Sequence, residues 1–389
     1  GSGHGMAAGS ESMQSSPDAD AHVECIALWR LPDDFYTLGP EAQWVAIRSV
    51  STPAQELSEP RTACSMKVLD EAMIAMYFLI TLGLPWALGA ISIVLVVTGF
   101  HPLKWFGFMV FLALHPMPRF NLALRSSRLA LALIRYFSIE LILDRKIPLL
   151  ADLCTKAVDE AAFQDAHLPM VALACPHGVF NYGAIAWCCV SRWICGWYQY
   201  TGGAAAVGYV PGLRYLDPFV WLVDADRKSI KRALQERVPG NLQRGGMLGM
   251  VPDGILGAFR STPGVDELAI GKKRGLMRIC LEEGTTIYAG WFFGTTDMLT
   301  VVQDPWGIME KFSRRFKAAI MFYYARFYLP IPYRVPVTII VHPEKAEKTE
   351  NPTEEQVEAF HQRVYGGLTR VYQQQRGYAG HPKRTLLIT

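Results

Sequence analysis

The chain has 389 residues, of which 51% are hydrophobic and 19% are charged, and its mean hydropathy is +0.15. This composition is apolar for a soluble enzyme but too polar for a transporter with many membrane spans, so it indicates one anchored stretch and one globular body. A net charge of +3, without Lys/Arg runs interleaved with aromatics, argues against a nucleic-acid partner. The eight cysteines form no zinc-type spacing, which indicates free thiols in a reducing compartment and no metal site.

The N-terminal arm, residues 1–66, opens with a stretch rich in Gly, Ser, Ala and Asp that runs from Gly1 to His22. Its low hydrophobicity predicts disorder, and it lacks the apolar core of a signal peptide. The rest of the arm carries four aromatic residues and is expected to pack on another part of the protein; these are Trp29, Phe35, Tyr36 and Trp44.

A hydrophobic membrane hairpin is predicted within residues 67–147. Ala72 to Phe100 contains no charged residue and exceeds the ~20 helical residues that cross a hydrocarbon core about 30 Å thick. A second apolar block, Trp105 to Met117, is short for a span. Two membrane readings stay open, namely two crossings or a hairpin dipping into one leaflet; the soluble alternative is a buried core helix.

Basic residues crowd the far side of this apolar region, and by the positive-inside rule they keep the following body in the cytosol. They are Arg119, Arg125, Arg128, Arg135, Arg145 and Lys146. Leu129 to Ile142, with Arg135 near its centre, is predicted to form an amphipathic helix lying on the bilayer surface.

Residues 148–389 are predicted to form a catalytic domain of the α/β class, with a mixed, largely parallel sheet and flanking helices, because strand and helix signals alternate there. The expected strands are Met170–Cys175, Met247–Val251, Thr286–Phe293 and Val335–Val341. The expected helices are Gly178–Cys195, Arg227–Arg237, Lys272–Glu283, Trp306–Tyr328 and a last one that begins with a capping box at Thr353 and runs toward Gln375.

An imidazole stands at the end of the first of these strands, in the sequence Cys-Pro-His177-Gly178. The carboxyl ends of parallel strands are where α/β enzymes keep their catalytic groups. A histidine with a pKa near ~6.5 takes a proton from a hydroxyl at cellular pH, so we interpret His177 as a general base. The alternative is a histidine held by the backbone at a helix N-terminus. A dyad with Cys175 is disfavoured, because residues two apart on a strand point the same way.

A carboxylate closes another predicted strand in the sequence Val-Pro-Asp253-Gly254. Neighbouring strand ends would bring Asp253 to His177, where it would orient the imidazole ring. The alternative is a turn-forming Asx residue ahead of Gly254. Two basic helix starts, one at Arg227 and one at Lys272, Lys273 and Arg274, are candidates for phosphate binding; the alternative is a solvated surface.

Six blocks of this sequence resemble, in order, those of the type 2 diacylglycerol acyltransferase family, which includes monoacylglycerol and wax-ester acyltransferases. They are Arg135-Tyr-Phe-Ser-Ile139, Cys175-Pro-His177-Gly178, Arg227, Lys273-Arg274-Gly275-Leu276, Ala289-Gly290-Trp-Phe-Phe293-Gly294 and Pro332-Tyr-Arg-Val-Pro336-Val-Thr338. Two positions depart from the family pattern: Cys175 replaces a histidine, and Gly257 replaces the glutamate of a Gly-Gly-x-x-Glu block.

The resemblance implies transfer of an acyl group from acyl-CoA, a co-substrate rather than a cofactor, to diacylglycerol in the endoplasmic reticulum membrane or at lipid droplets. It implies His177 as the base, Asp253 in place of the missing glutamate, and backbone N–H groups at Gly178 for the oxyanion. Substrate binding is expected from Arg227, Lys272, Lys273, Arg274, Gly254, Phe293 and Gly294. The alternatives are other acceptors (monoacylglycerol, a long-chain alcohol, a lysolipid) or a catalytically silent membrane scaffold; a homo-oligomer stays open.

Overall fold

A computed structural model describes residues 22–54, 61–115, 121–151, 169–195, 198–236, 246–316 and 319–389. Within these residues, nine strands form one sheet in the order β2-β1-β3-β12-β9-β4-β7-β5-β6. Their bounds are β1 Val23–Ala27, β2 Ser51–Pro53, β3 Glu140–Asp144, β4 Met170–Cys175, β5 Tyr200–Gly203, β6 Leu222–Asp224, β7 Met247–Met250, β9 Thr286–Phe293 and β12 Thr338–Lys345. The predicted disordered stretch before His22 lies outside the described residues.

The predicted mixed, largely parallel sheet is confirmed. The pairs β3–β12, β9–β4, β4–β7, β7–β5 and β5–β6 are parallel, whereas β1–β2, β1–β3 and β9–β12 are antiparallel. Two small sheets pair β8 (Asp266–Leu268) with β13 (Leu386–Ile388) and β10 (Thr300–Val301) with β11 (Tyr323–Tyr324).

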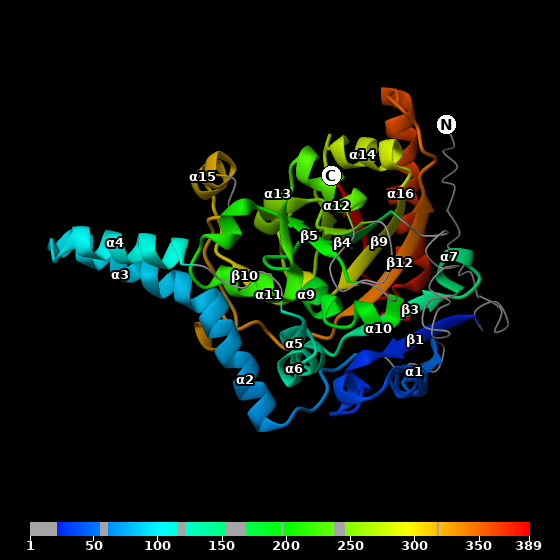
Figure 1. Ribbon diagram of the computed structural model, residues 1–389, viewed down its shortest axis with the longest axis horizontal. Helices are drawn as coiled ribbons and strands as arrows, with labels where there is room; N and C mark the ends of the chain where they lie inside the picture. The colour runs from blue at the N-terminus through cyan, green and yellow to red at the C-terminus, as the bar shows by residue number, and fades with distance from the viewer. Residues whose placement is uncertain are drawn as a thin grey trace, which may run out of the picture.

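Helices flank the sheet (Figure 1). On one side lie α12 (Arg227–Gln235), α14 (Gly275–Glu283) and α16 (Glu354–Gln375), and on the other lie α6 (Arg128–Tyr136), α9 (Tyr182–Cys188) and α10 (Ser191–Cys195). The capping box at Thr353 is present, and α16 ends at Gln375 as predicted. The helix predicted over Trp306–Tyr328 is wrong in its second half, because α15 ends at Phe316 and β11 follows.

Six further helices belong to the described part of the body. Their bounds are α1 Pro40–Ser49, α5 Leu122–Arg125, α7 Pro148–Ala151, α11 Asp217–Val220, α13 Gly254–Arg260 and α15 Ile308–Phe316. The N-terminal arm packs on the body through its aromatics: Phe35 and Tyr36 contact the ring of Trp193, and the Tyr36 hydroxyl donates to the Cys189 carbonyl at 3.0 Å.

The predicted interfacial helix over Leu129–Ile142 is wrong. The helix α6 ends at Tyr136, and Glu140 begins β3, a strand inside the large sheet. The apolar face of α6 is buried against the body, including Leu131 and Ile134, so it is not free to lie on a bilayer. The amphipathic pattern was real, but the protein interior covers its apolar face and no lipid is needed there.

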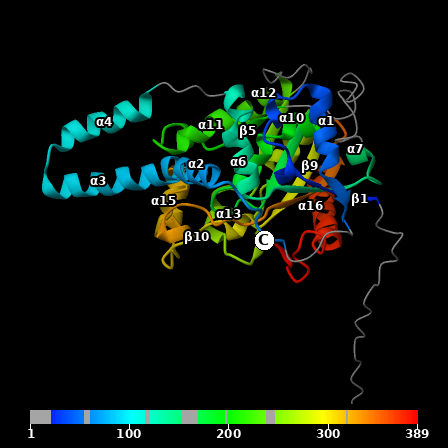
Figure 2. The ribbon, with the colours of Figure 1, turned by 90° about the horizontal axis from the view of Figure 1, so that it is seen from below.

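A helical hairpin projects from the body (Figures 1 and 2). Its first arm is a continuous helix from Val68 to Thr98, made of α2 (Val68–Phe78), a π-turn and α3 (Leu84–Thr98). Within the described residues it is the one helix long and apolar enough to cross a membrane, judged by length and composition. The chain turns back into α4 (Pro102–Leu114), and the Trp105 indole donates to Ser92 Oγ at 2.7 Å. Insertion of this hairpin into a bilayer remains a prediction.

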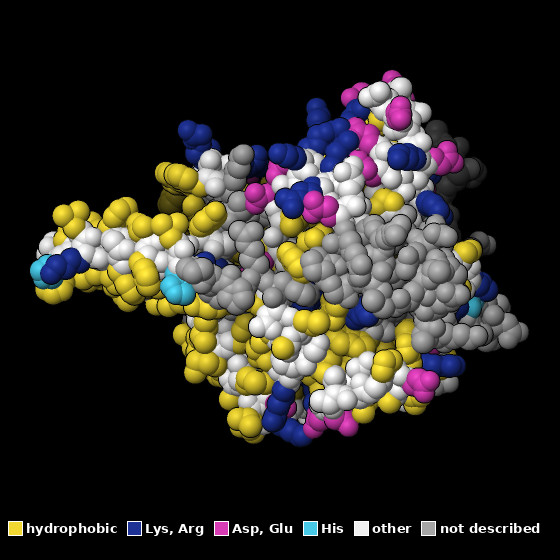
Figure 3. All heavy atoms as spheres, in the orientation of Figure 1, with side chains coloured by type: hydrophobic (Ala, Val, Ile, Leu, Met, Phe, Trp, Pro, Cys, Tyr) yellow, Lys and Arg dark blue, Asp and Glu magenta, His cyan; other side chains and the backbone are white. Residues whose placement is uncertain are grey.

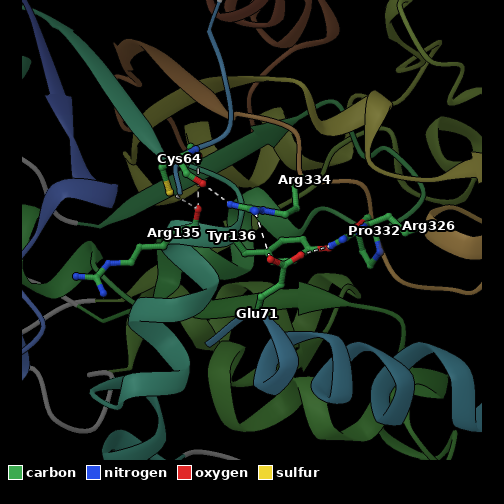
Figure 4. A network of polar contacts seen from close by, with 8 residues as sticks. Cys64, Glu71, Arg135, Tyr136, Arg326, Pro332 and Arg334 are labelled. Carbon is green, nitrogen blue, oxygen red and sulfur yellow. Dashed lines mark hydrogen bonds and ion pairs between the residues drawn. The ribbon is translucent and has the colours of Figure 1, made fainter. Parts of the chain in front are cut away.

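The base of the hairpin is fixed to the body by a polar network (Figure 4). Glu71 of α2 accepts from Arg326 at 2.7 Å and from Arg334 at 3.4 Å. The Tyr136 hydroxyl donates to the Pro332 carbonyl at 2.6 Å. Two of the sequence blocks, the one at Arg135 and the one at Pro332, therefore meet here and hold the start of the apolar helix.

Most of the basic residues taken as topology signals serve the fold. Arg125 is buried and donates to the Cys188 carbonyl at 2.8 Å, Arg128 pairs with Asp70 at 2.7 Å, and Arg145 pairs with Glu24. Arg135 contacts Asp33 and Leu31, while Arg119 lies outside the described residues. Arg125, Arg128 and Arg145 thus compensate buried or half-buried acceptors, and Arg135 pairs with an exposed one, so a cytosolic body remains a prediction.

Candidate active site

His177 comes two residues after the end of β4 and lies at the carboxyl end of the central strands, as predicted. Its Nδ1 lies 2.9 Å from the Gly178 carbonyl oxygen. A carbonyl only accepts, so Nδ1 carries the proton in this contact and Nε2 keeps its lone pair. The backbone thus selects the tautomer in which Nε2 is available as a base.

Gly178 is required by the backbone. Its φ is +60°, in the left-handed region, and a Cβ at this position would lie 2.8 Å from the Thr295 carbonyl oxygen. The turn that carries His177 is therefore packed tightly on the turn that follows β9. This close approach fixes the direction in which the imidazole leaves the sheet.

Asp253 lies beside His177, in the turn between β7 and α13, and its side chain is fully buried. Its Oδ2 accepts the main-chain N–H of His177 at 3.0 Å. We expected this carboxylate to orient the imidazole ring, but it holds the backbone of His177 instead, because the ring bonds to Gly178. Burial raises the pKa of Asp253, while the nearby His177 and Lys273 oppose that shift.

Gly257 makes room for this carboxylate. A Cβ built at Gly257 would lie 2.0 Å from Oδ2 of Asp253, far inside contact distance. The aspartate therefore occupies the space that any side chain at residue 257 would need. At the position where the family pattern has a glutamate, this chain therefore has a glycine with the carboxylate of Asp253 beside it.

Asn181, which the sequence analysis missed, supports the same loop. Its Nδ2 donates to the Pro176 carbonyl at 2.9 Å, and its Oδ1 accepts from the Ala184 N–H at 2.8 Å as the N-cap of α9. The side chain thus ties the residue before His177 to the start of a helix. The signal was an asparagine ahead of a helical stretch, whereas the predicted helix began too early, at Gly178.

A large apolar cavity of about 1320 Å³ extends from His177 to the hairpin. Near the site it is lined by His177, Asn181 and Gly254, and at its far end by Trp86 and Ile93 of α3. Its lining is mostly hydrophobic, and it exceeds the ~300–1,000 Å³ of typical ligand pockets. Such a space suits a long hydrocarbon substrate that arrives beside the hairpin.

The predicted phosphate ligands lie outside the lining of this cavity. Arg227 pairs with Glu282 at 2.6 Å, and Arg274 pairs with Glu358 at 2.6 Å. Lys272 and Lys273 are both exposed at the surface, but Nζ of Lys273 donates to the Asp253 carbonyl at 2.7 Å, and partial burial of this group lowers its pKa. Lys273 is therefore the cation of this set that the structure brings closest to His177.

Phe293 and Gly294, also predicted to bind substrate, belong to the scaffold beside the site. The ring of Phe293 is buried and stacks on Tyr372 and His381. Gly294 has φ +87°, and a Cβ there would lie 2.4 Å from the Pro336 carbonyl oxygen. Neither residue lines the cavity. Among the described residues, no group of three or more metal-ligating side chains comes together.

Comparison with known proteins identifies the family. A model of the diacylglycerol acyltransferase family matches residues 156–389, more than half of the chain. The chain belongs to this family. In this diacylglycerol acyltransferase family member, the hairpin and the strands β1 to β3 lie before the region that the family model matches.

Individual relatives differ in the acceptors that their names give. The chain is 28% identical over 211 residues to acyl-CoA wax alcohol acyltransferase 2 of Mus musculus, covering 51% of this chain and 62% of that one. It is 27% identical to 2-acylglycerol O-acyltransferase 1 of Bos taurus, over 43% of this chain and 51% of that one. Diacylglycerol O-acyltransferase 2 of Bos taurus is 22% identical over 54% of this chain and 62% of its own length. The matches thus span about half to two thirds of these relatives.

Proposed function

We propose that the protein is a membrane-bound O-acyltransferase that moves a fatty acyl group from acyl-CoA to the free hydroxyl of diacylglycerol, forming triacylglycerol. The observation that carries this proposal is the position of His177, which lines an apolar cavity reaching the membrane-type helix α3. Membership of the diacylglycerol acyltransferase family supports the reaction class. A lipid hydroxyl entering along this cavity would meet a histidine whose Nε2 lacks a proton.

In the proposed reaction, Nε2 of His177 takes the hydroxyl proton as that oxygen attacks the thioester carbonyl. The new C–O bond forms, the C–S bond breaks, and the proton passes to the departing CoA thiolate. Backbone N–H groups at Gly178 and Val179 are proposed to stabilise the oxyanion. Asp253 contributes by holding the backbone of His177, which keeps the imidazole aimed into the cavity.

The phosphates of CoA are proposed to bind on the surface near Lys273, together with Lys272, Arg274 and Arg227. Lys273 lies next to Asp253 and Gly254, at the edge of the site. Binding there requires the ion pairs of Arg227 and Arg274 to rearrange or to be shared with phosphate. Both pairs lie at the surface with one half-buried partner each, and surface ion pairs are typically worth ~0.2–1 kcal/mol, so their exchange costs little.

The acceptor is the least constrained part of the proposal. The names of the relatives include a wax alcohol, a 2-acylglycerol and a diacylglycerol acyltransferase. The same His177 chemistry serves each of these hydroxyls, and the choice depends on the shape of the cavity. Monoacylglycerol, a long-chain alcohol and a lysolipid are therefore the alternative acceptors.

We also propose that the hairpin embeds the protein in the endoplasmic reticulum membrane or at the lipid droplet surface, with the body in the cytosol. The exposed apolar side chains of α3 and α4 support this placement (Figure 3). The silent-scaffold alternative is motivated by the two departures from the family pattern, at Cys175 and Gly257. The Asp253 carboxylate beside Gly257 supports the enzyme, because it places an acid near His177 where the family glutamate is missing.

The test is formation of labelled triacylglycerol from labelled acyl-CoA and diacylglycerol, in membranes of a host without such enzymes. His177→Ala is compared with the wild type and with His342→Ala, a half-buried histidine of β12 outside the cavity. We expect His177→Ala to lose ~10²–10⁴-fold in rate, and His342→Ala to keep most of its activity. Label in another ester would reassign the acceptor, and no label in any product would favour the scaffold.

A further inference from the structure

A second apolar surface is formed by residues outside the hairpin. Residues 306–316 and 319–329, which we call the aromatic segment, carry a concentration of large exposed hydrophobic side chains. They are Trp306, Ile308, Phe312, Phe316, Ile320, Phe322, Phe327, Tyr328 and Leu329. Single exposed apolar residues need no explanation, but a contiguous group on one segment marks an interaction surface.

The helix α15 within this segment has the pattern of a helix that lies on a bilayer. Ile308, Phe312 and Phe316 follow at intervals of four and share one exposed face, and the rings of Phe312 and Phe316 stack. One flank of that face carries the exposed cations Lys311 and Arg315. An apolar face bordered by basic residues is complementary to acyl chains beneath anionic headgroups.

Hydrogen bonds hold the rest of the segment in place. The Ser313 hydroxyl of α15 donates to the Ile320 carbonyl at 3.2 Å and accepts the Ile320 N–H at 2.8 Å. Further along, Phe327 and Tyr328 both have φ +58° and expose 74% and 87% of their surface. Arg326 fixes this turn to Glu71 at the hairpin base. The fold thus holds two aromatic side chains outward in a backbone conformation that they rarely adopt.

The aromatic segment also adjoins the hairpin and the cavity. Trp86 of α3 packs on Phe322 and Tyr323, with ring centroids 4.5 and 5.6 Å apart. Residues of both elements line the cavity that reaches His177, among them Phe316 and Ile93. Figures 1 and 3 show α15 on the side of the body from which the hairpin projects. The two apolar surfaces are therefore continuous, and the cavity lies between them.

We propose that the aromatic segment is a second bilayer contact, which lies at the boundary of headgroups and acyl chains and forms, opposite α3, one wall of the entrance for lipid substrate. The occupant is the lipid bilayer, with anionic lipid beside Lys311 and Arg315. The bilayer contact stands on the exposed residues alone, whereas the entrance rests on the proposed function.

The test places a benzophenone amino acid at one position at a time in the full-length chain, in vesicles of phosphatidylcholine and phosphatidylserine that contain a labelled phospholipid. The probes are Phe312 and Tyr328, the hairpin reference is Val94, and the matched control is Ala359, an exposed residue of α16 far from the hairpin. On irradiation, we expect lipid label at Phe312, Tyr328 and Val94, and none at Ala359.

Label at Val94 without label at Phe312 and Tyr328 would overturn the proposal and leave the proposed function untouched, since lipid capture requires no acyl transfer. Cross-links from Phe312 to a second copy of the chain would likewise overturn it, by showing that this face joins protein to protein. Equal labelling at Ala359 would also overturn it, because the capture would then not distinguish a membrane face.

The entrance is tested with the double variant Ile308→Glu/Phe312→Glu, neither position of which lines the cavity. We expect a raised KM for a long-chain acceptor in the bilayer and an unchanged KM for a short-chain acceptor in water. The control is Val45→Glu, at an exposed position on α1. An unchanged KM for both acceptors would remove the entrance from the proposal, and equal rises for both would attribute the effect to the cavity itself.

Discussion

The hairpin and the centre of the sheet are both strongly apolar, yet their side chains meet opposite surroundings. All eight residues of β9 are buried, whereas α4 has no buried residue. The sheet buries its apolar surface within the protein, between the helices on its two sides. Among the described residues, most of the hairpin beyond its base has no such cover, so its stability in that conformation depends on a solvent as apolar as itself.

The sheet and the hairpin also differ in the polar groups that they contain. The loop at the end of β4 contains the carbonyl that fixes the His177 tautomer and a capping asparagine, and the turn after β7 brings the buried carboxyl of Asp253 to the main chain of His177. In contrast, α3 contains no charged residue from Leu84 to Thr98. The sheet end should therefore respond to packing changes and to pH, and the hairpin to the medium around it.

The same substitution should have opposite consequences in the two regions. Val171→Asp, at a fully buried position of β4, places an unpaired charge in the core and should cost more than about 4 kcal/mol, enough to prevent folding. Val94→Asp, 58% exposed on α3, should change the Tm of the protein in detergent little. It should instead weaken membrane retention, since a charge at the bilayer centre costs about 2.5–3.5 kcal/mol. Thermal unfolding in micelles measures the loss of stability, and alkaline extraction of membranes measures membrane retention. Equal losses of Tm in the two variants would contradict the difference expected between the sheet and the hairpin.

Packing at Gly257 gives the next largest effect. Gly257→Ala should destabilise the fold by about 1–3 kcal/mol, and Gly257→Glu by more, because the new Cβ meets Asp253. The control Gly366→Ala, in α16 with open space around its Cβ, should instead stabilise by roughly 0.5–1 kcal/mol. Replacing Asp253 by Gly in the Gly257→Glu background should recover part of the loss. If the two losses are additive in a double-mutant cycle, the residues do not share this space.

A pH effect is expected at the sheet end and not in the uncharged helix α3. Burial raises the pKa of Asp253 above its usual 3.8. At a pH between 3.8 and this raised pKa, the folded chain holds a proton on Asp253 that the unfolded chain has released. The contribution of this group to stability therefore falls as pH rises from about 3.8 through the raised value. Asp253→Asn keeps an acceptor for the His177 N–H and removes this loss, so its Tm relative to wild type should rise with pH across that window. If the difference in Tm between Asp253→Asn and the wild type stays constant with pH, Asp253 has the same pKa in the folded and unfolded chains.

The smallest change in stability is expected on the exposed surface. Arg227→Ala and Arg232→Ala each break one ion pair on α12, with Glu282 and Glu236 respectively, and each should cost only ~0.2–1 kcal/mol. Their effects on catalysis should differ, because only Arg227 is proposed to contact CoA. We expect a higher KM for acyl-CoA in Arg227→Ala alone. Equal KM values in the two variants would withdraw Arg227 from the substrate site.

Several parts of the site could be predicted because local chemistry dictates them. The apolar run before His177 and the glycine after it specify a strand and a tight turn, and the structure places both there. The capping box at Thr353 specifies the start of α16. The prediction of an interfacial helix at α6 was wrong because local chemistry does not decide it. An amphipathic pattern indicates that one face of a helix contacts an apolar neighbour, but not whether that neighbour is lipid or protein.

The sequence by itself determined the α/β class, the long uncharged helix, the strand that carries His177 and the family, because each depends on residue types at fixed spacing. Only the tertiary structure decided that Asp253 holds the backbone of His177, that Gly257 makes room for it, and that Phe293 lies in the core. It also joined the aromatic segment to the hairpin beside one cavity. These facts depend on contacts between residues far apart in the chain, and hydrophobic periodicity records that a face is covered but not what covers it.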